Sequence, residues 1–190
     1  MAKHRYLIKH ALAATGALWF SLGATVAMCQ ASDTKIDPLL DQLAKSSAET
    51  AQSIAKELRF LWRKSGSDAV DVVYQRAQNN LEQQNFTRAC EHFSAAIEFA
   101  PDFVAAYLGR ARCYAAQDYF GPAIADLKHA LIINPNHFDA LAFLGFIYER
   151  LGYLERAQQA YDLVLTIHPH HDDVIKARDR LGQLRTRTKL

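Results

Sequence analysis

Small and apolar residues recur along the middle of the chain with a period of 34 residues. Three copies, 70–103, 104–137 and 138–171, align without a gap. Within each copy the apolar residues recur at steps of three and four, the spacing that places side chains on one face of an α-helix. Each copy therefore predicts two amphipathic helices. The aligned positions are Ala77, Ala111 and Gly145 at the eighth, Ala89, Ala123 and Ala157 at the twentieth, and Phe93, Leu127 and Tyr161 at the twenty-fourth.

Each copy has a short turn near its middle and a proline near its end. Proline ends the second helix because it cannot donate a backbone hydrogen bond and disfavours helix in the residue before it. Small residues at the eighth and twentieth positions let the paired helices approach closely, and the bulky residue at the twenty-fourth fills the space beside them. A helical hairpin buries only one face against the next, so the copies are expected to stack. The turns are Gln83-Gln84-Asn85, Gln117-Asp118-Tyr119 and Leu151-Gly152-Tyr153, and the prolines are Pro101, Pro135 and Pro169.

This pattern resembles the tetratricopeptide repeat over about 100 of the 190 residues. The resemblance implies an all-α, right-handed helical solenoid whose concave groove, lined mainly by the first helix of each copy, binds a protein or peptide. Three phrases further resemble short exported tetratricopeptide proteins of alphaproteobacteria, although the second copy opens with Ala105-Ala-Tyr107-Leu where that group more often has Gly-Trp-Asn. The phrases are Trp62-Arg-Lys-Ser-Gly-Ser, Ala100-Pro-Asp-Phe and Pro135-Asn-His-Phe-Asp-Ala-Leu-Ala-Phe-Leu-Gly.

The resemblance also implies which side chains line the groove, at positions two, five, nine and twelve of each first helix. Arg112 lies at the centre of this predicted surface. Either it binds a carboxylate of a bound peptide, or it faces water or pairs inside the groove with Asp71, Asp139 or Glu149. The predicted groove residues are Asp71, Tyr74, Gln78, Leu81, Ala105, Leu108, Arg112, Ala115, Asp139, Ala142, Phe146 and Glu149.

One subtype of the family is not expected here. Repeats that clamp the C-terminal carboxylate of chaperones carry Lys or Arg and Asn at several groove positions. This chain departs from that pattern, so we expect the clamp to be absent. The residues at the matching positions are Tyr74, Gln78, Gly109, Asp139 and Phe143.

The N-terminus has the layout of an export signal, with Lys3, Arg5 and Lys9 followed by a charge-free run over 11–32. We expect residues 1–31 to be a cleaved signal peptide, with Ala31 or Ala27 before the cut. An uncleaved membrane anchor is the alternative, since about 20 apolar residues can cross a bilayer. Positive charge keeps the leading end cytoplasmic in both cases. Both therefore predict a periplasmic location, with or without a tether to the inner membrane.

Charge and chemical motifs exclude several function classes. Without residues 1–31 the chain has 19 Lys and Arg against 20 Asp and Glu, a balance that does not indicate nucleic-acid binding. The sequence lacks a phosphate-cradling glycine loop, a His-Glu-x-x-His, a Gly-x-Ser-x-Gly and a Cys-x-x-Cys. We therefore expect no enzymatic activity and no cofactor.

Two helical segments flank the repeats. Residues 32–67 carry an apolar stripe from Ile36 to Trp62, in one or two helices with a possible break near Lys45-Ser-Ser-Ala-Glu-Thr-Ala. The stripe either covers the first hairpin, as terminal repeats require, or binds a partner or a second copy of the chain. Residues 172–190 predict a capping helix to Leu184 and a basic tail, whose charges face solvent or, alternatively, contact anionic lipid.

Cysteines and histidines offer two further candidate sites. Cys90 and Cys113 occupy buried positions that face the neighbouring hairpin, where they form either a disulfide in an oxidising compartment or two buried thiols. The run His168-Pro169-His170-His171-Asp172-Asp173 has ligand-type side chains. Because a proline recurs here in every copy, we interpret the run as the third inter-repeat connection and expect no metal.

The sequence therefore predicts an exported, non-catalytic scaffold or adaptor that binds a peptide or protein partner in its groove, in envelope assembly or maintenance. Two alternatives stay open. One is a membrane-tethered structural protein that forms homo-oligomers through residues 36–62. The other is a carrier of a small ligand.

Overall fold

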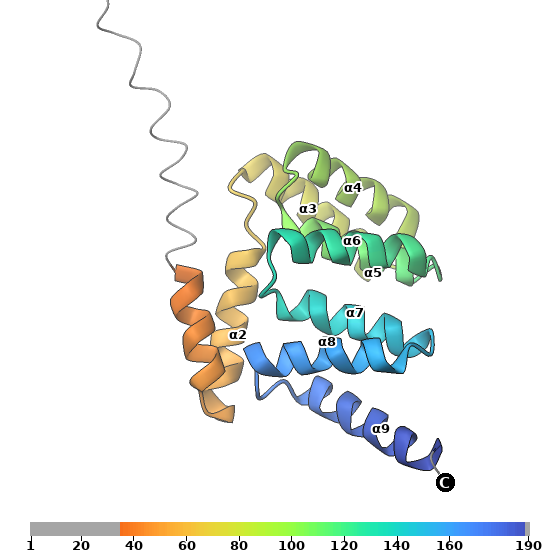
Figure 1. The fold of residues 1–190 in the computed structure, drawn as a ribbon. Coiled ribbons are helices and arrows are strands. Elements are labelled where there is room, and N and C mark those ends of the chain that lie inside the picture. The colour runs from red at the N-terminus through yellow and green to blue at the C-terminus, as the bar shows by residue number, and fades with distance from the viewer. Residues whose placement is uncertain (1–34, 189–190) are drawn as a thin grey trace, which may run out of the picture.

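The structure, a computed structural model, describes residues 35–188 and shows helices joined by turns throughout that range (Figure 1). The expected signal segment, residues 1–31, lies outside the described residues. The predicted N-terminal helical segment is two helices, one over residues 35–45 and α2 (Ala48–Trp62), separated at Ser46 and Ser47. The break therefore falls in the Ser-rich stretch where the sequence has its weakest helix preference.

The three copies form three helix pairs in chain order, and a last helix follows them. Each helix packs against the next along the chain, so the pairs stack into one row (Figure 1). This confirms the all-α class with three helix-turn-helix repeats between two helical flanks. The elements are α3 (Asp68–Glu82), α4 (Phe86–Phe99), α5 (Val104–Ala115), α6 (Phe120–Ile133), α7 (Phe138–Arg150), α8 (Leu154–Ile167) and α9 (Asp172–Thr188).

The turn inside each copy closes in the same way. The backbone amide of the residue after the turn donates to the carbonyl five residues earlier. The residue just before that donor has a left-handed backbone conformation, as in a Schellman helix end. Glycine takes that conformation in the third copy, whereas the first two place Gln and Asp there at a steric cost. The hydrogen bonds run from the amide of Asn85 to the carbonyl of Asn80 (2.8 Å), from Tyr119 to Tyr114 (2.9 Å) and from Tyr153 to Tyr148 (2.8 Å). The φ angles are 60° at Gln84, 59° at Asp118 and 79° at Gly152.

The helices that precede the three prolines end as the sequence predicts. Residues Ala100, Asn134 and His168 immediately before them have φ of −138°, −132° and −131°. A residue before proline avoids the helical region because its own backbone would clash with the proline ring. The prolines therefore redirect the chain into each following copy.

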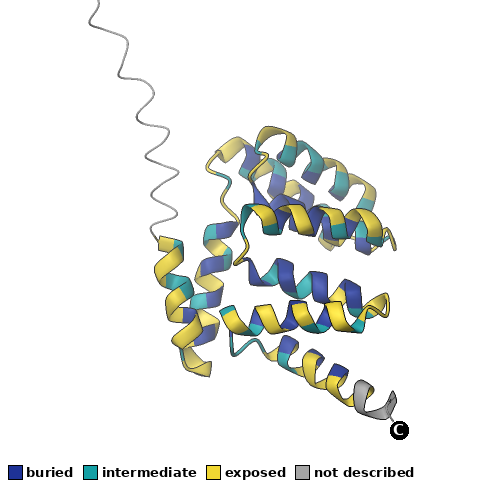
Figure 2. Cartoon of the chain, in the orientation of Figure 1, coloured by how far each residue is buried: buried dark blue, intermediate teal, exposed yellow. Residues whose placement is uncertain are grey.

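Bulky residues at the twenty-fourth position form the centre of each hairpin. Phe93 and Leu127 are fully buried and Tyr161 is nearly so. Figure 2 shows buried residues along α7 and exposed residues along much of α8, which has fewer buried positions than α7.

Two of these rings lie directly over glycine. A Cβ at Gly109 would overlap the ring of Phe93, and a Cβ at Gly145 would lie 2.5 Å from the ring of Tyr161. Phe93 belongs to the first copy and Gly109 to the second, so this contact joins neighbouring hairpins. Close approach of ring and backbone requires glycine at both positions.

We expect Gly109→Ala to lower the free energy of unfolding by about 1–3 kcal/mol, the usual cost of overpacking a core. Phe93 is fully buried, so its ring cannot move aside into solvent without disrupting the core. Urea denaturation monitored by circular dichroism measures the change. Gly121→Ala in α6 is the matched control, since its Cβ would meet nothing within 4 Å and should leave stability unchanged or slightly higher. Equal stability of Gly109→Ala and the wild type would contradict the packing described.

A disulfide links the first two copies. The structure joins the sulfur atoms of Cys90 in α4 and Cys113 in α5, whose Cα atoms lie 5.8 Å apart. That Cα separation is within the usual disulfide range. Gln117 covers the bond from the turn after α5, and its amide donates to the Cys113 carbonyl at 3.1 Å.

Removal of this disulfide by Cys90→Ser with Cys113→Ser is expected to cost the oxidised protein about 3 kcal/mol of unfolding free energy. The crosslink spans 23 residues and restricts the unfolded chain. Urea denaturation with and without reductant measures the effect, and the double variant should not respond to reductant. Full alkylation of both cysteines in the unreduced wild type would show that the bond does not form.

Candidate functional site

Five of the predicted groove residues line one cavity. Tyr74 from α3, Leu108 and Arg112 from α5, and Asp139 from α7 surround about 140 Å³ of space together with Ala105. The rest of the lining is Arg59, Trp62 and Arg63, which lie at the C-terminal end of α2 and outside the repeats, together with His137. The repeat pattern predicts the residues of α3, α5 and α7 in this cavity and does not predict those near the end of α2.

The remaining predicted groove residues lie along the same first helices, outside the cavity. Phe146 is 46% exposed, and its ring stacks in parallel on Phe143 with centroids 5.9 Å apart. The guanidinium of Arg112 lies 5.9 Å from the centre of the Phe143 ring. An aromatic stretch therefore continues from Arg112 along α7. The others are partly buried Asp71, Gln78, Leu81, Ala142 and Glu149, and buried Ala115.

The carboxylate of Asp71 in α3 bonds to the turn that precedes this helix. It accepts hydrogen bonds from the backbone amide and the hydroxyl of Ser65, both at 2.8 Å, and pairs with Lys64 at 3.3 Å. Burial alone would raise the pKa of Asp71, but the bonds from Ser65 and Lys64 outweigh it and hold the pKa below its usual value. Asp71 is thus an anchor for the turn rather than a partner of Arg112.

The other two groove carboxylates also have partners elsewhere. Asp139 accepts two hydrogen bonds from Arg59, at 2.8 and 2.9 Å. Glu149 accepts two from Arg180 of α9, at 2.8 and 2.9 Å, and one from the Tyr161 hydroxyl at 2.9 Å. Burial would raise the pKa of Asp139 and Glu149, yet these arginine contacts lower it in both.

Arg112 is consequently a groove cation that no described carboxylate contacts at ion-pair distance, although its charge helps to lower the pKa of Asp139. Its side chain is exposed, and the hydrogen bonds and ion pairs of residues 35–188 do not include it. Of the alternatives that the sequence left open, pairing with Asp71, Asp139 or Glu149 is therefore wrong for this structure. Arg112 is available for a ligand that carries negative charge.

The N-terminal helices dock on the third copy, not on the first. Trp62 stacks on His137 with centroids 4.2 Å apart and packs on Phe138 at 5.0 Å. The buried residues of α2 belong to the cluster that contains Phe138, whereas the first copy has a separate cluster built from its own helices and residues of α5. Figure 1 shows α2 beside the ends of α7 and α8. The expectation that the Trp62 stripe covers the first hairpin is therefore wrong, because its aromatic partners lie at the boundary of the third copy.

The histidine-rich connection forms part of this docking. His168 and His171 contact the ring of Phe138 with centroids 5.3 and 6.3 Å away, and a ring nitrogen of His170 lies 3.0 Å from the Ser46 carbonyl oxygen. The connection therefore holds the N-terminal hairpin against the repeats. Across residues 35–188 no group of three or more His, Cys, Asp or Glu side chains is arranged to hold a metal ion.

The last helix covers the third copy with Val174, Ala177 and Leu181, which are buried. It continues to Thr188, past the end predicted at Leu184. Part of its basic face is neutralised within the chain by the pairing of Arg180 with Glu149. Among the described helices, none combines the length and apolar character that a bilayer span requires.

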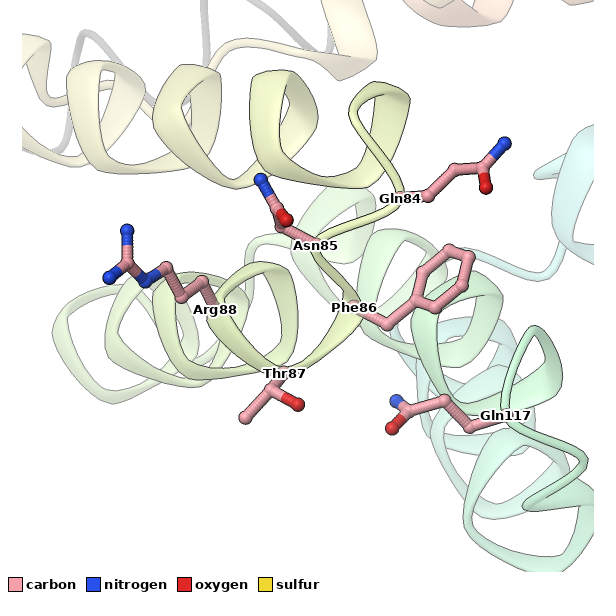
Figure 3. Close-up of a pocket in the computed structure, with 6 residues that line it drawn as sticks. All are labelled: Gln84, Asn85, Phe86, Thr87, Arg88 and Gln117. Atoms are coloured by element: carbon pink, nitrogen blue, oxygen red, sulfur yellow. The ribbon is translucent and has the colours of Figure 1, made fainter.

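A second, larger cavity of about 340 Å³ lies at the turn of the first copy, lined by Gln84, Asn85, Phe86, Thr87, Arg88 and Gln117. Figure 3 shows that these side chains spread in different directions, with Arg88 pointing away from Gln84. A binding site needs polar groups that converge on one point. We therefore take the groove cavity as the candidate site.

Comparisons with known proteins agree with this architecture. Residues 138–171 match the tetratricopeptide repeat family, the same bounds as the third copy. The chain is 29% identical over 136 residues to a TPR repeat-containing protein of Rhizobium etli, a match that covers 71% of this chain and 67% of that protein. It is also 29% identical over 103 residues to the CTR9 homolog of Arabidopsis thaliana, covering 54% of this chain and 9% of that protein.

Solved structures show the same fold at low sequence identity. The Sgt2 TPR domain from Aspergillus fumigatus has a TM-score of 0.61 at 16% identity, covering 65% of this chain and 83% of that one. The first TPR of Spaghetti (RPAP3) bound to an HSP90 peptide has a TM-score of 0.59 at 20% identity, covering 62% and 93%. The TPR2B domain of yeast Sti1 in complex with an Hsp70 peptide has a TM-score of 0.58 at 18% identity, covering 62% and 99%.

Proposed function

We propose that this chain, a tetratricopeptide repeat protein, is a non-catalytic scaffold that binds an extended segment of another protein along α3, α5 and α7. The observation that carries the proposal is the exposed Arg112 over the ring of Phe143, on which the exposed ring of Phe146 stacks. The three carboxylates of this surface already have partners. Aromatic and arginine side chains are the usual energetic centres of protein interfaces. The HSP90 and Hsp70 peptides held by two structures of the same fold support a peptide as the type of ligand.

The size of the cavity favours a side chain of a larger partner over a free small molecule. Sites for drug-sized ligands have about 300–1,000 Å³, more than the 140 Å³ beside Arg112. The small-ligand carrier is therefore the weaker alternative. Oligomerisation through residues 36–62 is also weaker, since Ala51, Ala55, Leu58 and Trp62 of α2 are buried inside the chain.

We further propose that the protein is exported and acts in assembly or maintenance of the bacterial envelope. The basic start and apolar run of residues 1–31 support export, and a disulfide between Cys90 and Cys113 suits an oxidising compartment. The intact mass of the protein from fractionated native cells tests this. A mass that lacks about 30 residues in the periplasmic fraction is expected, and a full-length cytoplasmic protein would contradict export.

Substitution of the groove tests the binding proposal. Arg112→Glu combined with Phe146→Ala should reduce recovery of the native partner by at least tenfold, because one change reverses charge and the other removes exposed aromatic surface. The control is Arg88→Glu with Phe99→Ala, which makes the same chemical changes on α4, where Phe99 is 72% exposed. Quantitative mass spectrometry after cross-linking in native cells measures recovery. If the groove variant retains every partner, the groove is not the binding surface.

A further inference from the structure

The geometry points to a site for one acidic side chain of the bound segment, built jointly by Arg63, the residue after α2, and Arg112 of α5. This inference rests on the proposed function and specifies the chemistry of the ligand. Both arginines line the groove cavity. One comes from the repeats and the other from the N-terminal hairpin, so the complete site exists only while that hairpin is docked on the third copy.

Positive charge exceeds negative charge around the cavity. Its lining includes Arg59, Arg63 and Arg112 but only one carboxylate, Asp139. Arg59 holds that carboxylate with two hydrogen bonds at 2.8 and 2.9 Å. Arg63 and Arg112 are exposed, and within residues 35–188 no hydrogen bond or ion pair engages either guanidinium. An incoming carboxylate would therefore meet two guanidinium groups that no described carboxylate contacts directly.

The hydroxyl of Tyr74 provides a third donor at the same place. Tyr74 is buried, and its hydroxyl oxygen accepts a hydrogen bond from the Gln78 amide at 2.8 Å. Its own proton is therefore left for an acceptor in the cavity. Burial raises the pKa of Tyr74, and the charges of Arg63 and Arg112 both act against that rise. The two guanidinium groups thus lie close enough to act on the same hydroxyl.

The shape of the surroundings indicates an acidic residue inside a peptide. A cavity of 140 Å³ holds a carboxylate with its methylene groups, since one water occupies about 30 Å³. Leu108, Ala105 and Trp62 supply apolar walls for those methylenes. The stacked rings of Phe143 and Phe146 begin beside Arg112 and suit apolar neighbours of the acidic residue. The expected ligand is an extended segment with Asp or Glu next to apolar residues.

A displayed library of random linear 12-residue peptides, presented without a free carboxyl end, tests this on the full-length oxidised protein. We expect enrichment of sequences that place one acidic residue beside apolar residues. A selected peptide, synthesised with both ends capped, should lose at least tenfold in affinity when its acidic residue becomes Gln or Asn. Arg63→Gln in the protein should cause a similar loss of affinity. Combining it with the Gln or Asn peptide should lower the affinity little further, because both changes remove the same interaction.

Three controls keep the outcome decisive. Arg88→Gln alters an exposed arginine at the other cavity and should leave affinity unchanged. Arg63→Lys keeps the charge and should retain more affinity than Arg63→Gln, although a lysine loses the paired donors. Because Arg63 is exposed at the end of α2, its variants should remain folded, which circular dichroism checks.

Other results would overturn the inference in distinguishable ways. If Phe146→Ala weakens the peptide tenfold while Arg63→Gln changes affinity less than twofold, the acidic site is wrong and groove binding stands. If replacing the peptide's acidic residue has no effect but freeing its carboxyl end raises affinity tenfold, a chain end is the ligand instead. If no peptide is enriched, or neither Phe146→Ala nor Arg63→Gln weakens the selected one, both the site and the proposed function fail.

Discussion

Phe138→Ala is expected to lower the free energy of unfolding by about 3–5 kcal/mol, the cost of removing a fully buried phenylalanine. Phe138 lies where three parts of the chain meet. Its ring contacts Trp62 of α2 at 5.0 Å, His168 after α8 at 5.3 Å and the guanidinium of Arg59 at 5.0 Å. Removal of the ring therefore weakens both the third copy and the docking of the N-terminal hairpin.

Urea denaturation measures this loss, and hydrogen exchange locates it. Amides of α2 should exchange faster in Phe138→Ala than amides of α4, since α2 loses its contact while α4 packs in a separate cluster. Phe60→Ala is the matched control, because Phe60 is 63% exposed on α2 and should change stability by no more than about 0.5 kcal/mol. Similar effects of the two substitutions would show that α2 is not anchored at Phe138.

Acidification from pH 6.5 to pH 4 is expected to destabilise the protein through the same region. Burial lowers the pKa of His137 and of His168 to about 4, against 6.5 in the unfolded chain. Between these values the unfolded state binds more protons, so stability is present above pH 6.5 and is lost as the pH falls toward 4. Each histidine contributes up to about 3 kcal/mol over that window, at 1.36 kcal/mol per pKa unit.

The charged neighbours act on these histidines in both directions. Asp139 raises the pKa of His137 and of His168, whereas Arg59 lowers both and Arg112 lowers that of His137. Asp139 and Glu149 have lowered pKa values themselves, so their contribution is lost at a lower pH, below their usual range near 4. The two groups of residues therefore affect stability in different pH windows.

Unfolding free energies measured in urea at several pH values between 7 and 4 test this prediction. His137→Asn keeps a side-chain acceptor for the Ala140 amide and removes one titrating group. Its stability should depend less steeply on pH than that of the wild type between 6.5 and 4. A wild-type stability that stays constant over this window would mean that the histidines are not buried in neutral form.

The repeat architecture could be predicted from sequence because its determinants are local. Pro101, Pro135 and Pro169 each end the preceding helix through their own backbone chemistry. The small residues at the eighth and twentieth positions recur within one hairpin, so the close approach of its helices is visible in the pattern. The groove register follows from the same alignment, and three of its residues, Tyr74, Leu108 and Arg112, line one cavity.

The missing wall of that cavity could not be predicted in the same way. Trp62 contacts His137 and Arg59 pairs with Asp139, and these residues are 75 and 80 positions apart in the chain. An apolar stripe on a helix shows that one face is buried, but it does not show which part of the protein covers that face. The sequence therefore left α2 with two possible partners, the first hairpin or another molecule, and the structure gives it a third.

The state of Arg112 was undetermined for a related reason. Its position in the repeat predicted a groove cation. Whether Asp71, Asp139 or Glu149 neutralises that cation depends on which other cations pair with these carboxylates in the folded chain. Lys64, Arg59 and Arg180, from outside the first helices, occupy them. Arg112 is available only because of contacts that no repeat pattern encodes.

A photo-crosslinking amino acid at position 146 tests whether the groove binds a segment of another protein. Incorporated into the protein in native cells, it should form one predominant adduct of higher mass on irradiation. The same amino acid at position 99, more exposed but on α4, should form little of that adduct, and Arg112→Glu should reduce the adduct at position 146. Equal adduct formation from both positions, or adduct from position 99 alone, would contradict binding of the partner in the groove.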